Sequence, residues 1–430
     1  MPSCQSVSTS SICLLTILAL FGAFNEISSY GQLPNQYTVK EIPGSLFDKS
    51  PGTPKIMDPK LRVEVVAENL SFPTSMAFLG PDDIIVLEKE RGTVTRIING
   101  AIVSEPLTKV KTASQVERGL LGLAVSGNQS SKTNVFLYFT EISNSTSGGD
   151  AIVSNRVYRY NLENAKLVNP KLLLDLPATP GPRHNGGAIE LDPAGNLYVP
   201  VGDVDGHTTQ AQNNEIGSPP DGTSGILRIS PNGQPIQSII GDNGPARKYF
   251  GYGIRNSYGL DFDPLNGRLW DTENGAGSAD EINLVEPGFN SGWSKIQGKA
   301  PASFNYSNLV HFEGKGKYRD PQFTWIDTVG PTKLKFLNTD KLGKVYENDL
   351  FVSDVHHGRV YHFDLNSTRT GLLLSGPVSD KVADTDVETR NLIFASDFGG
   401  ISDMEVGPDG YLYILSFARG IIYRIGAAAD

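Results

Sequence analysis

One short pattern recurs six times along the chain: an apolar run, a turn of Asp, Gly and Pro residues, and a strand ending in a hydrophobic–aromatic pair. The clearest copies occupy residues 191–198, 262–270 and 406–413, and looser copies centre on residues 84–85, 137–138 and 350–351. Most copies precede a second strand of the form Gly–x–hydrophobic–x–Arg, as at residues 92–97, 225–229 and 420–425. One such meander cannot bury both faces of its sheet alone, so the repeats must pack against one another. The pattern predicts an all-β fold, a six-bladed β-propeller of four-stranded antiparallel blades, with functional loops around its central channel.

The composition agrees with one propeller. The 430 residues include 46 Gly and 27 Pro, and apolar and polar residues alternate in segments such as 62–66, whereas helical periodicity is nearly absent. No second compositional regime follows the N-terminal segment, so we expect a single propeller over residues 61–430. The net charge of −10 comes without a basic stripe, which argues against nucleic acid as a partner.

The N-terminus carries a 13-residue apolar segment at residues 12–24. This segment is short for crossing about 30 Å of hydrocarbon, but its length is typical of the apolar region of a signal peptide. We therefore expect a signal peptide or N-terminal anchor over residues 1–31 and a linker over 32–60. The protein would be secreted, or held outside the cell by an uncleaved anchor, with no membrane insertion of the mature domain. Both cysteines, Cys4 and Cys13, lie in the leader, so the mature protein would have no disulfide.

Two residues form a candidate acid–base pair. His184 lies in an Arg-His-Asn-Gly-Gly segment just before a predicted strand, and Asp203 follows 19 residues later at the far end of the same meander. A carboxylate at that place could fix one imidazole nitrogen and leave the other as a general base. The alternative is a histidine and an aspartate that merely shape turns.

A second candidate is the acidic, Gly-rich loop at residues 271–283, which follows a strand ending at Trp270. Carboxylates and backbone carbonyls released by glycines are the hard oxygen ligands that calcium requires. The same composition also occurs in plain solvated turns. Just upstream, Arg255 and Asn256 stand at a strand entrance, where they could bind a ligand or tie down loops.

Other kinds of site lack their sequence signals. No nucleophile-elbow motif supports Ser/His/Asp catalysis, and His356 and His357 lie in a probable hairpin turn. No Gly-x-Gly-x-x-Gly stands between a strand and a helix, which excludes a Rossmann domain for nicotinamide cofactors.

The order and spacing of several motifs carry a family resemblance. These motifs occupy residues 70–78, 117–124, 183–187 with 202–203, 253–260, and 273–283 with 290–293. Together they resemble the soluble quinoprotein glucose/sorbosone dehydrogenases, also called aldose sugar dehydrogenases, over residues 65 to 427. That family is six-bladed, in agreement with the repeat count.

The resemblance implies a mechanism. His184 would remove the proton from the C1 hydroxyl of an aldose, and hydride would pass from C1 to pyrroloquinoline quinone, giving the lactone. Asp203 would orient His184, and Arg255 would stabilise the charge that develops near the quinone carbonyl. Of the positions that match the cofactor site, Asn256 would hydrogen-bond the quinone; the others are Glu117, Asn274, Gly275, His356 and Ser402. The electron acceptor that reoxidises the cofactor is not implied.

The resemblance also implies calcium. Backbone carbonyls of Gly275 and Ala276 would hold the ion that polarises the quinone, and Glu281 with the backbone of Ser291 would match a second, structural site. Asp280 adds a further carboxylate to this group of metal ligands.

Three positions depart from the family pattern. His356 stands where glucose-oxidising members carry Lys, the segment at residues 400–403 with Ser402 replaces Arg-x-Arg-Asp, and Glu117 replaces Gln. Three cations that would face the cofactor's carboxylates are thus missing, and charged hydrogen bonds are worth about 1.5–3 kcal/mol each. Basic residues that could compensate are Arg118, Arg183 and Lys248.

Two other functions remain open. The missing cations favour a non-catalytic extracellular propeller that binds carbohydrate or protein, whereas the His184–Asp203 pair favours an enzyme. A calcium-dependent sugar lactonase is also found on six-bladed propellers, but it needs metal-ligating side chains in the central channel. Fold alone does not separate these functions.

Overall fold

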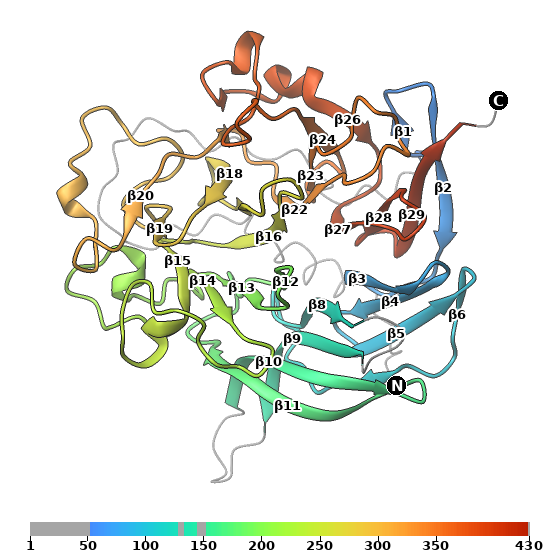
Figure 1. Cartoon of the computed structure of the whole chain (residues 1–430), viewed down its shortest axis with the longest axis horizontal. Helices are drawn as coiled ribbons and strands as arrows, with labels where there is room; N and C mark the ends of the chain where they lie inside the picture. The colour runs from blue at the N-terminus through green and yellow to red at the C-terminus, as the bar shows by residue number, and fades with distance from the viewer. Residues whose placement is uncertain (1–51, 128–132, 144–151, 429–430) are drawn as a thin grey trace, which may run out of the picture.

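The computed structural model describes residues 52–127, 133–143 and 152–428. The predicted signal peptide or anchor at residues 1–31 lies outside these ranges. The described strands form six sheets arranged in a ring (Figure 1). The all-β propeller predicted from the repeats is confirmed. Within the described ranges, no helix is long and apolar enough to cross a membrane. The helical segments are 3-10 turns: η1 (Gln210–Gln212), η2 (Gly244–Lys248), η3 (Tyr306–Asn308), η4 (Gly376–Val378) and η5 (Asp386–Leu392).

Each sheet takes the name of its innermost strand. The β3 sheet contains β3 (Pro73–Gly80), β4 (Asp83–Glu88), β5 (Thr93–Ile98), β6 (Ala101–Ile102) and β7 (Thr108–Lys109). The β8 sheet contains β8 (Leu120–Ser126), β9 (Asn134–Ser143), β10 (Ile152–Glu163) and β11 (Lys166–Pro177). The β12 sheet contains β12 (Glu190–Leu191), β13 (Leu197–Val201), β14 (Gly225–Ile229), β15 (Tyr249–Tyr252), β19 (Phe289–Asn290) and β20 (Lys317–Tyr318).

The other three sheets complete the ring. The β16 sheet contains β16 (Ser257–Phe262), β17 (Leu269–Glu273), β18 (Asp280–Val285), β21 (Phe323–Trp325) and β25 (Val382–Ala383). The β22 sheet contains β22 (Pro331–Phe336), β23 (Leu350–Asp354), β24 (Val360–Phe363), β26 (Ile393–Ser396) and β1 (Lys55–Ile56). The β27 sheet contains β27 (Ile401–Val406), β28 (Leu412–Ser416), β29 (Ile421–Ala427) and β2 (Leu61–Ala67).

The prediction of uniform four-stranded antiparallel blades is wrong. Only the β8 and β27 sheets have four strands in the described ranges, and the others have five or six. The additional strands are mostly two-residue segments, and some pair in parallel: β15 with β19, β19 with β20, and β21 with β25. These short strands come from long connections that lie against the outer edge of a sheet, where free backbone groups accept pairing.

The repeated turns explain the second strand of several sheets. Asp192, Asp263 and Asp409 each accept a hydrogen bond on Oδ1 from the backbone N–H two residues later, at 2.9, 3.0 and 3.1 Å. Such side-chain bonds hold a tight turn and reverse the chain. The hydrophobic–aromatic pairs that follow are buried, but they begin β13, β17 and β28 instead of ending a strand as the pattern predicts.

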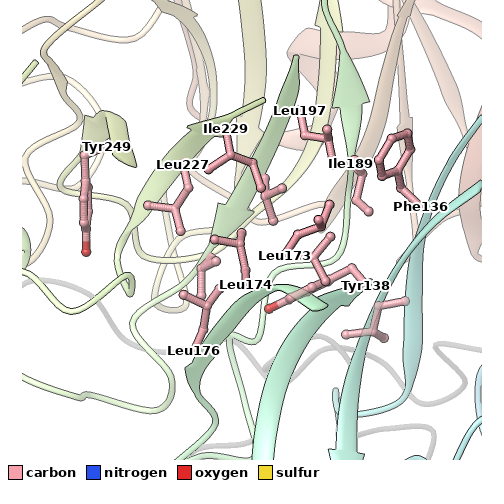
Figure 2. Close-up of a cluster of buried hydrophobic side chains, with 14 of the residues drawn as sticks. Phe136, Tyr138, Leu173, Leu174, Leu176, Ile189, Leu197, Leu227, Ile229 and Tyr249 are labelled. Carbon is pink, nitrogen blue, oxygen red and sulfur yellow. The ribbon is translucent and has the colours of Figure 1, made fainter. Parts of the chain in front are cut away.

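The core lies between neighbouring sheets rather than at the centre of the ring. In the contact between the β8 and β12 sheets, Phe136 and Tyr138 of β9 and Leu174 of β11 pack against Leu197 of β13 and Leu227 of β14 (Figure 2). All five side chains are at most 1% exposed. Burying a side chain of this size contributes about 1.5–3 kcal/mol, so this packing holds adjacent sheets in fixed relation.

Strands from both ends of the described chain close the ring. β2 is the outermost strand of the β27 sheet, where it pairs with β29, and β1 pairs with β26. Glu64 of β2 accepts a hydrogen bond from Arg424 of β29 at 3.1 Å, across 360 residues of sequence. β1 lies inside residues 32–60, so part of the predicted linker already belongs to the propeller.

Charged side chains from four innermost strands meet across the channel. Lys333 of β22 lies 3.1 Å from both Glu190 of β12 and Glu405 of β27. Lys335 lies 2.9 Å from Glu405 and 3.3 Å from Asp261 of β16. Together with Asp403 of β27, these residues form the channel network. Two cations therefore bridge carboxylates from three neighbouring sheets.

Candidate active site

The predicted site residues from different sheets meet at one face of the ring. The innermost and second strands of each sheet are antiparallel, so the first begins at the edge where the second ends. Glu117, His184 and Arg255 precede the innermost strands β8, β12 and β16. Asp203 and Asn274 follow the second strands β13 and β17. Chain topology alone therefore brings these five residues to one edge.

His184 and Asp203 form a buried pair. The Nδ1 atom of His184 lies 2.5 Å from Oδ1 of Asp203, and the two residues are 7% and 3% exposed. The Nε2 atom of His184 is buried and has no hydrogen-bond partner among the residues that the structure describes. Burial alone would raise the pKa of Asp203, but His184 and Arg255 outweigh it and hold that pKa below its usual value. An ionised Asp203 accepts a hydrogen bond from the Nδ1–H group of His184, so the lone pair of the imidazole is on Nε2.

The backbone around this pair is unusual. His184 has a left-handed φ of 57°, which costs a non-glycine residue about 1–2 kcal/mol. Gly202 allows the chains to approach, because a Cβ atom there would lie 2.4 Å from the His184 carbonyl oxygen and 2.5 Å from that of Arg255. Strain of this kind persists where the surrounding structure fixes a functional side chain.

Trp293 connects the pair to Arg255. Its indole Nε1 donates a hydrogen bond to the second oxygen of Asp203 at 2.9 Å, and the Arg255 guanidinium lies 5.6 Å from the centre of its ring. Asp203 therefore has a partner on each oxygen, and its orientation toward His184 is fixed. In the sequence, Trp293 is only one letter of a motif, so its contact with Asp203 could not be inferred.

Glu117, which precedes β8, contacts His184. Its Oε2 accepts a hydrogen bond from the backbone N–H of His184, and its Oε1 is buried without a partner. Burial raises its pKa to about 7, although His184, Arg255 and Arg183 oppose the shift.

Lys89, at the end of β4, is a cation that the sequence analysis missed. It is fully buried, and its Nζ donates to the Ser114 carbonyl at 3.1 Å. Burial lowers its pKa to about 8, while Glu90 and Glu117 oppose this shift. In the sequence, Lys89 lies between two glutamates and resembles any solvated charged turn.

The acidic loop is held by Arg255. Nη1 of Arg255 donates hydrogen bonds to the carbonyl oxygens of Asn274 and Gly275 at 2.9 and 2.8 Å. The Gly275 carbonyl that the resemblance assigns to calcium is therefore bonded to a guanidinium here. The Ala276 N–H donates to Gln297 Oε1 at 3.3 Å, so this residue faces the loop after Trp293.

Asp280 connects this loop to the segment before β22 by hydrogen bonds. Its two oxygens accept hydrogen bonds from the backbone N–H groups of Gly275, Val329 and Gly330 at 2.8, 2.7 and 2.8 Å. A carboxylate with three such donors is well satisfied without a metal. The observed role of Asp280 is therefore to hold the loop in place.

Three other carboxylates are buried together beneath the loop. Asp271, Glu273 and Glu281 lie on β17 and β18, where Glu273 is directly opposite Glu281, and none is more than 5% exposed. Glu273 and Glu281 both accept from the Ser291 hydroxyl, at 2.6 and 3.2 Å. Both oxygens of Asp271 lack a hydrogen bond of normal geometry, although Ser257 and Asn283 lie near enough to lower its pKa. The acidic loop pointed to Glu281, but not to Asp271 as a partner.

The acidity of these groups reflects their surroundings. Burial raises the pKa of Asp271 and of Glu281 to about 7 and that of Glu273 well above its usual value, and neighbouring carboxylates add to the shifts. Among the described residues, no Lys or Arg forms an ion pair with any of the three. When ionised, these three buried carboxylates have no basic side chain among the described residues to balance their charge.

The remaining predicted cofactor residues differ in availability. Asn256 is 4% exposed with a partnerless Oδ1, and the buried Nε2 of His356 also lacks a partner. Asn274 Nδ2 donates to the Pro331 carbonyl at 3.1 Å. The Ser402 hydroxyl donates to the Pro73 carbonyl at 2.7 Å, which joins β27 to β3. Asn256 and His356 thus present free polar atoms, whereas Asn274 and Ser402 are engaged by the scaffold.

The three suggested replacement cations lie in different places. Arg118 donates to the Ala178 carbonyl, and Arg183 lies 3.8 Å from Asp205 at the rim near His184. Lys248 lies in η2 before β15, at the edge of the β12 sheet opposite His184. Arg183 is therefore near the base, whereas Lys248 is remote from it.

Known proteins share this chain's sequence and fold. The sequence model of the glucose/sorbosone dehydrogenase family matches residues 70–424. An aldose sugar dehydrogenase of Escherichia coli K12 is 25% identical over 365 residues, which cover 83% of this chain and 90% of that protein. Quinoprotein glucose dehydrogenase B of Acinetobacter calcoaceticus is 29% identical over 274 residues, 57% of this chain and 55% of that protein.

Solved structures agree. A putative glucose dehydrogenase from Thermus thermophilus is 27% identical with a TM-score of 0.65, and the match covers 85% of this chain and 99% of that one. The PQQ-bound aldose sugar dehydrogenase of Streptomyces coelicolor, at 23% identity and a TM-score of 0.62, matches 87% and 100% of the two chains and shares the fold. Because the family model matches most of the propeller, the chain belongs to the glucose/sorbosone dehydrogenase family of sugar oxidoreductases.

Proposed function

We propose that this protein oxidises the C1 hydroxyl of an aldose sugar to the lactone, with pyrroloquinoline quinone as hydride acceptor and calcium as a bound ion. The observation that supports this most is the His184–Asp203 pair with its buried, partnerless Nε2. We also propose that each of the six sheets is one blade of a six-bladed ring, and that the protein acts outside the cell, as its leader predicts.

The pair suits removal of a hydroxyl proton. The lone pair on Nε2 accepts the proton from the sugar O–H, and the imidazolium that results keeps its Nδ1–H bond to Asp203. The negative charge of Asp203 stabilises this imidazolium, and Trp293 keeps the carboxylate in place. Positioned acid–base groups of this kind contribute about 10²–10⁴-fold in rate.

Unsatisfied polar atoms support a polar ligand beside His184. Glu117 Oε1, Asn256 Oδ1 and His356 Nε2 are buried without a hydrogen-bond partner among the described residues, as is Nε2 of His184, and buried polar atoms of this kind call for a partner. Arg255 adds a cation that could turn from the carbonyls of Asn274 and Gly275 to an anionic ligand. When bound, the quinone would accept the hydride released as the C1–O bond gains double-bond character.

The buried carboxylates support a calcium site. Asp271, Glu273 and Glu281, with Ser291, offer oxygen ligands and a charge that a divalent cation would balance. The Gly275 carbonyl is open to calcium only when Arg255 releases it. We therefore assign the ion to the carboxylate cluster, and regard Gly275 and Ala276 as ligands that depend on the cofactor.

Calcium is expected to stabilise the protein. At 100 times its Kd an ion adds about 2.7 kcal/mol, so with a Kd of about 10 μM, 1 mM calcium should raise the Tm of protein treated with a chelator by about 3–4 °C. The Asp271→Asn and Glu281→Gln variants should lose most of this shift in thermal unfolding, whereas Asp242→Asn, on an exposed carboxylate, should keep it. An unchanged Tm of the wild type in calcium would contradict the assignment.

The function is tested by titrating the calcium-loaded protein with pyrroloquinoline quinone and following absorbance and heat. Binding, followed by reduction of the quinone on addition of aldoses, is the expected result. Binding without reduction would point to a non-catalytic binding propeller. Absence of binding at high micromolar cofactor, together with hydrolysis of sugar lactones, would point to a calcium-dependent lactonase.

A further inference from the structure

Glu117 is an acid that faces the site from within the protein. It is 6% exposed, and its two oxygens differ: Oε2 accepts the backbone N–H of His184, while Oε1 is buried with no hydrogen-bond partner. A carboxylate can only accept hydrogen bonds. An ionised Oε1 therefore cannot bond to the carboxylate of an anionic ligand, and it repels that ligand.

Several charged or titratable groups surround Glu117. Arg183 and His184 precede β12, and Arg255 precedes β16. Tyr258 lies in β16, and Lys89 directly follows β4. The cations favour the ionised form of Glu117, but none forms an ion pair with it among the described residues. Burial, which disfavours the charge, is the stronger influence.

We propose that Glu117 binds the anionic cofactor as a neutral carboxylic acid, so that cofactor binding takes up one proton from solvent on Oε1. This inference rests on the proposed function, because it concerns the quinone that His184 would serve. The proton forms an O–H bond on Oε1 and no other bond changes. That O–H donates to an oxygen of the ligand, while Oε2 continues to accept the His184 N–H.

The protonated side chain has the hydrogen-bonding pattern of glutamine. It offers one carbonyl oxygen as an acceptor and one donor beside it, in nearly the same shape. The resemblance implies Gln at this position, and a protonated Glu117 would make the same pair of bonds. The difference is that binding here depends on pH, because burial places the titration of Glu117 near neutrality.

The affinity for the cofactor is expected to fall as the pH rises. Below about pH 6 Glu117 is already protonated, and affinity should be flat. Above about pH 7 a proton must be gained on binding, so Kd should rise about tenfold per pH unit. The Glu117→Gln variant needs no proton, and at pH 9 it should bind about 10–100-fold more tightly than the wild type.

The experiment is isothermal calorimetry with pyrroloquinoline quinone between pH 6 and 9, in pairs of buffers that differ in ionisation enthalpy. At pH 8 the wild type should take up close to one proton per cofactor, and Glu117→Gln close to none. The His184→Asn variant should retain the uptake, which separates Glu117 from the histidine. Glu90→Gln, which removes a carboxylate beside Lys89, should also retain it.

The outcomes separate this inference from the proposed function. Tight binding by the wild type without proton uptake, or uptake that persists in Glu117→Gln, would overturn the role of Glu117 and leave the function standing. Absence of binding by both the wild type and Glu117→Gln at every pH would overturn both. Because proton uptake is measured on the wild type itself, a variant that fails to fold does not remove the test.

Discussion

Replacing His184 with Asn is expected to lower kcat for aldose oxidation by about 10²–10⁴-fold, while cofactor affinity changes only a few-fold. Nε2 of His184 is the buried, partnerless nitrogen next to an ionised carboxylate, and Asn has no basic atom to replace it. Asn is the suitable replacement because it tolerates the left-handed backbone at this position. Steady-state kinetics with separate kcat and KM values, together with calorimetric binding of the cofactor, would measure the effect.

Asp203→Asn is the companion variant. It keeps the shape of the side chain but removes the charge that supports the imidazolium, and its single amide oxygen can accept only one of the two hydrogen bonds that Asp203 accepts from His184 and Trp293. Its kcat should fall, because the imidazolium that forms on removal of the hydroxyl proton would lose its counter-charge. A His184→Asn enzyme with normal kcat would exclude His184 as the base. An Asp203→Asn enzyme with an unchanged kcat would show that the charge of Asp203 does not support the reaction.

Replacing Lys333 with Met is expected to destabilise the folded protein by about 3–5 kcal/mol. Lys333 is 6% exposed and lies among Glu190, Asp403 and Glu405, so its loss leaves Glu190 and Asp403 without an ion-pair partner among the described residues, whereas Glu405 keeps Lys335. Burial alone would lower the pKa of Lys333, but these carboxylates outweigh it and raise that pKa. The lysine is therefore charged at every pH at which the protein is studied. Denaturant unfolding or the thermal midpoint would measure the change.

A matched control uses an exposed ion pair. Lys166 lies 3.0 Å from Glu105, with side chains 49% and 79% exposed, and Lys166→Met should change stability by no more than about 0.5 kcal/mol. A double replacement of Lys333 and Glu405 by apolar residues should recover part of the loss, because it removes charge of both signs. Equal effects of the Lys333 and Lys166 changes would show that the channel network does not hold the sheets together.

The repeats predicted the parts of the fold that local chemistry determines. Asp192, Asp263 and Asp409 each fix a turn by a bond to a residue two positions away, so their effect is visible in a few letters of sequence. The additional strands are different. β19, β20 and β25 are two residues long and pair with distant segments, so no alternation could identify them.

The candidate site, like the fold, could be predicted only where local sequence determines it. His184, Asp203 and Arg255 stand in recognisable motifs at strand ends, and the structure brings them together. Lys89 was missed, and Asp271 was recognised only as one carboxylate of the acidic loop, because burial, rather than residue type, makes both unusual. A strand such as β22, in which Lys alternates with Leu and Phe, resembles a half-exposed strand. Only the ring shows that its polar side faces carboxylates from other sheets.

The closure of the ring by β2 has a consequence for synthesis. β2 is made before almost all of the propeller, but its partner β29 is among the last segments made, and Glu64 and Arg424 are 360 residues apart. At about 5–20 residues per second, roughly 20–70 s pass between the two. During that time the emerging β2 has no native partner, and a truncated product would leave the β27 sheet without β29 beside β2. Completion of the β27 sheet therefore waits until β29 has been made, and the earlier sheets must remain soluble until then.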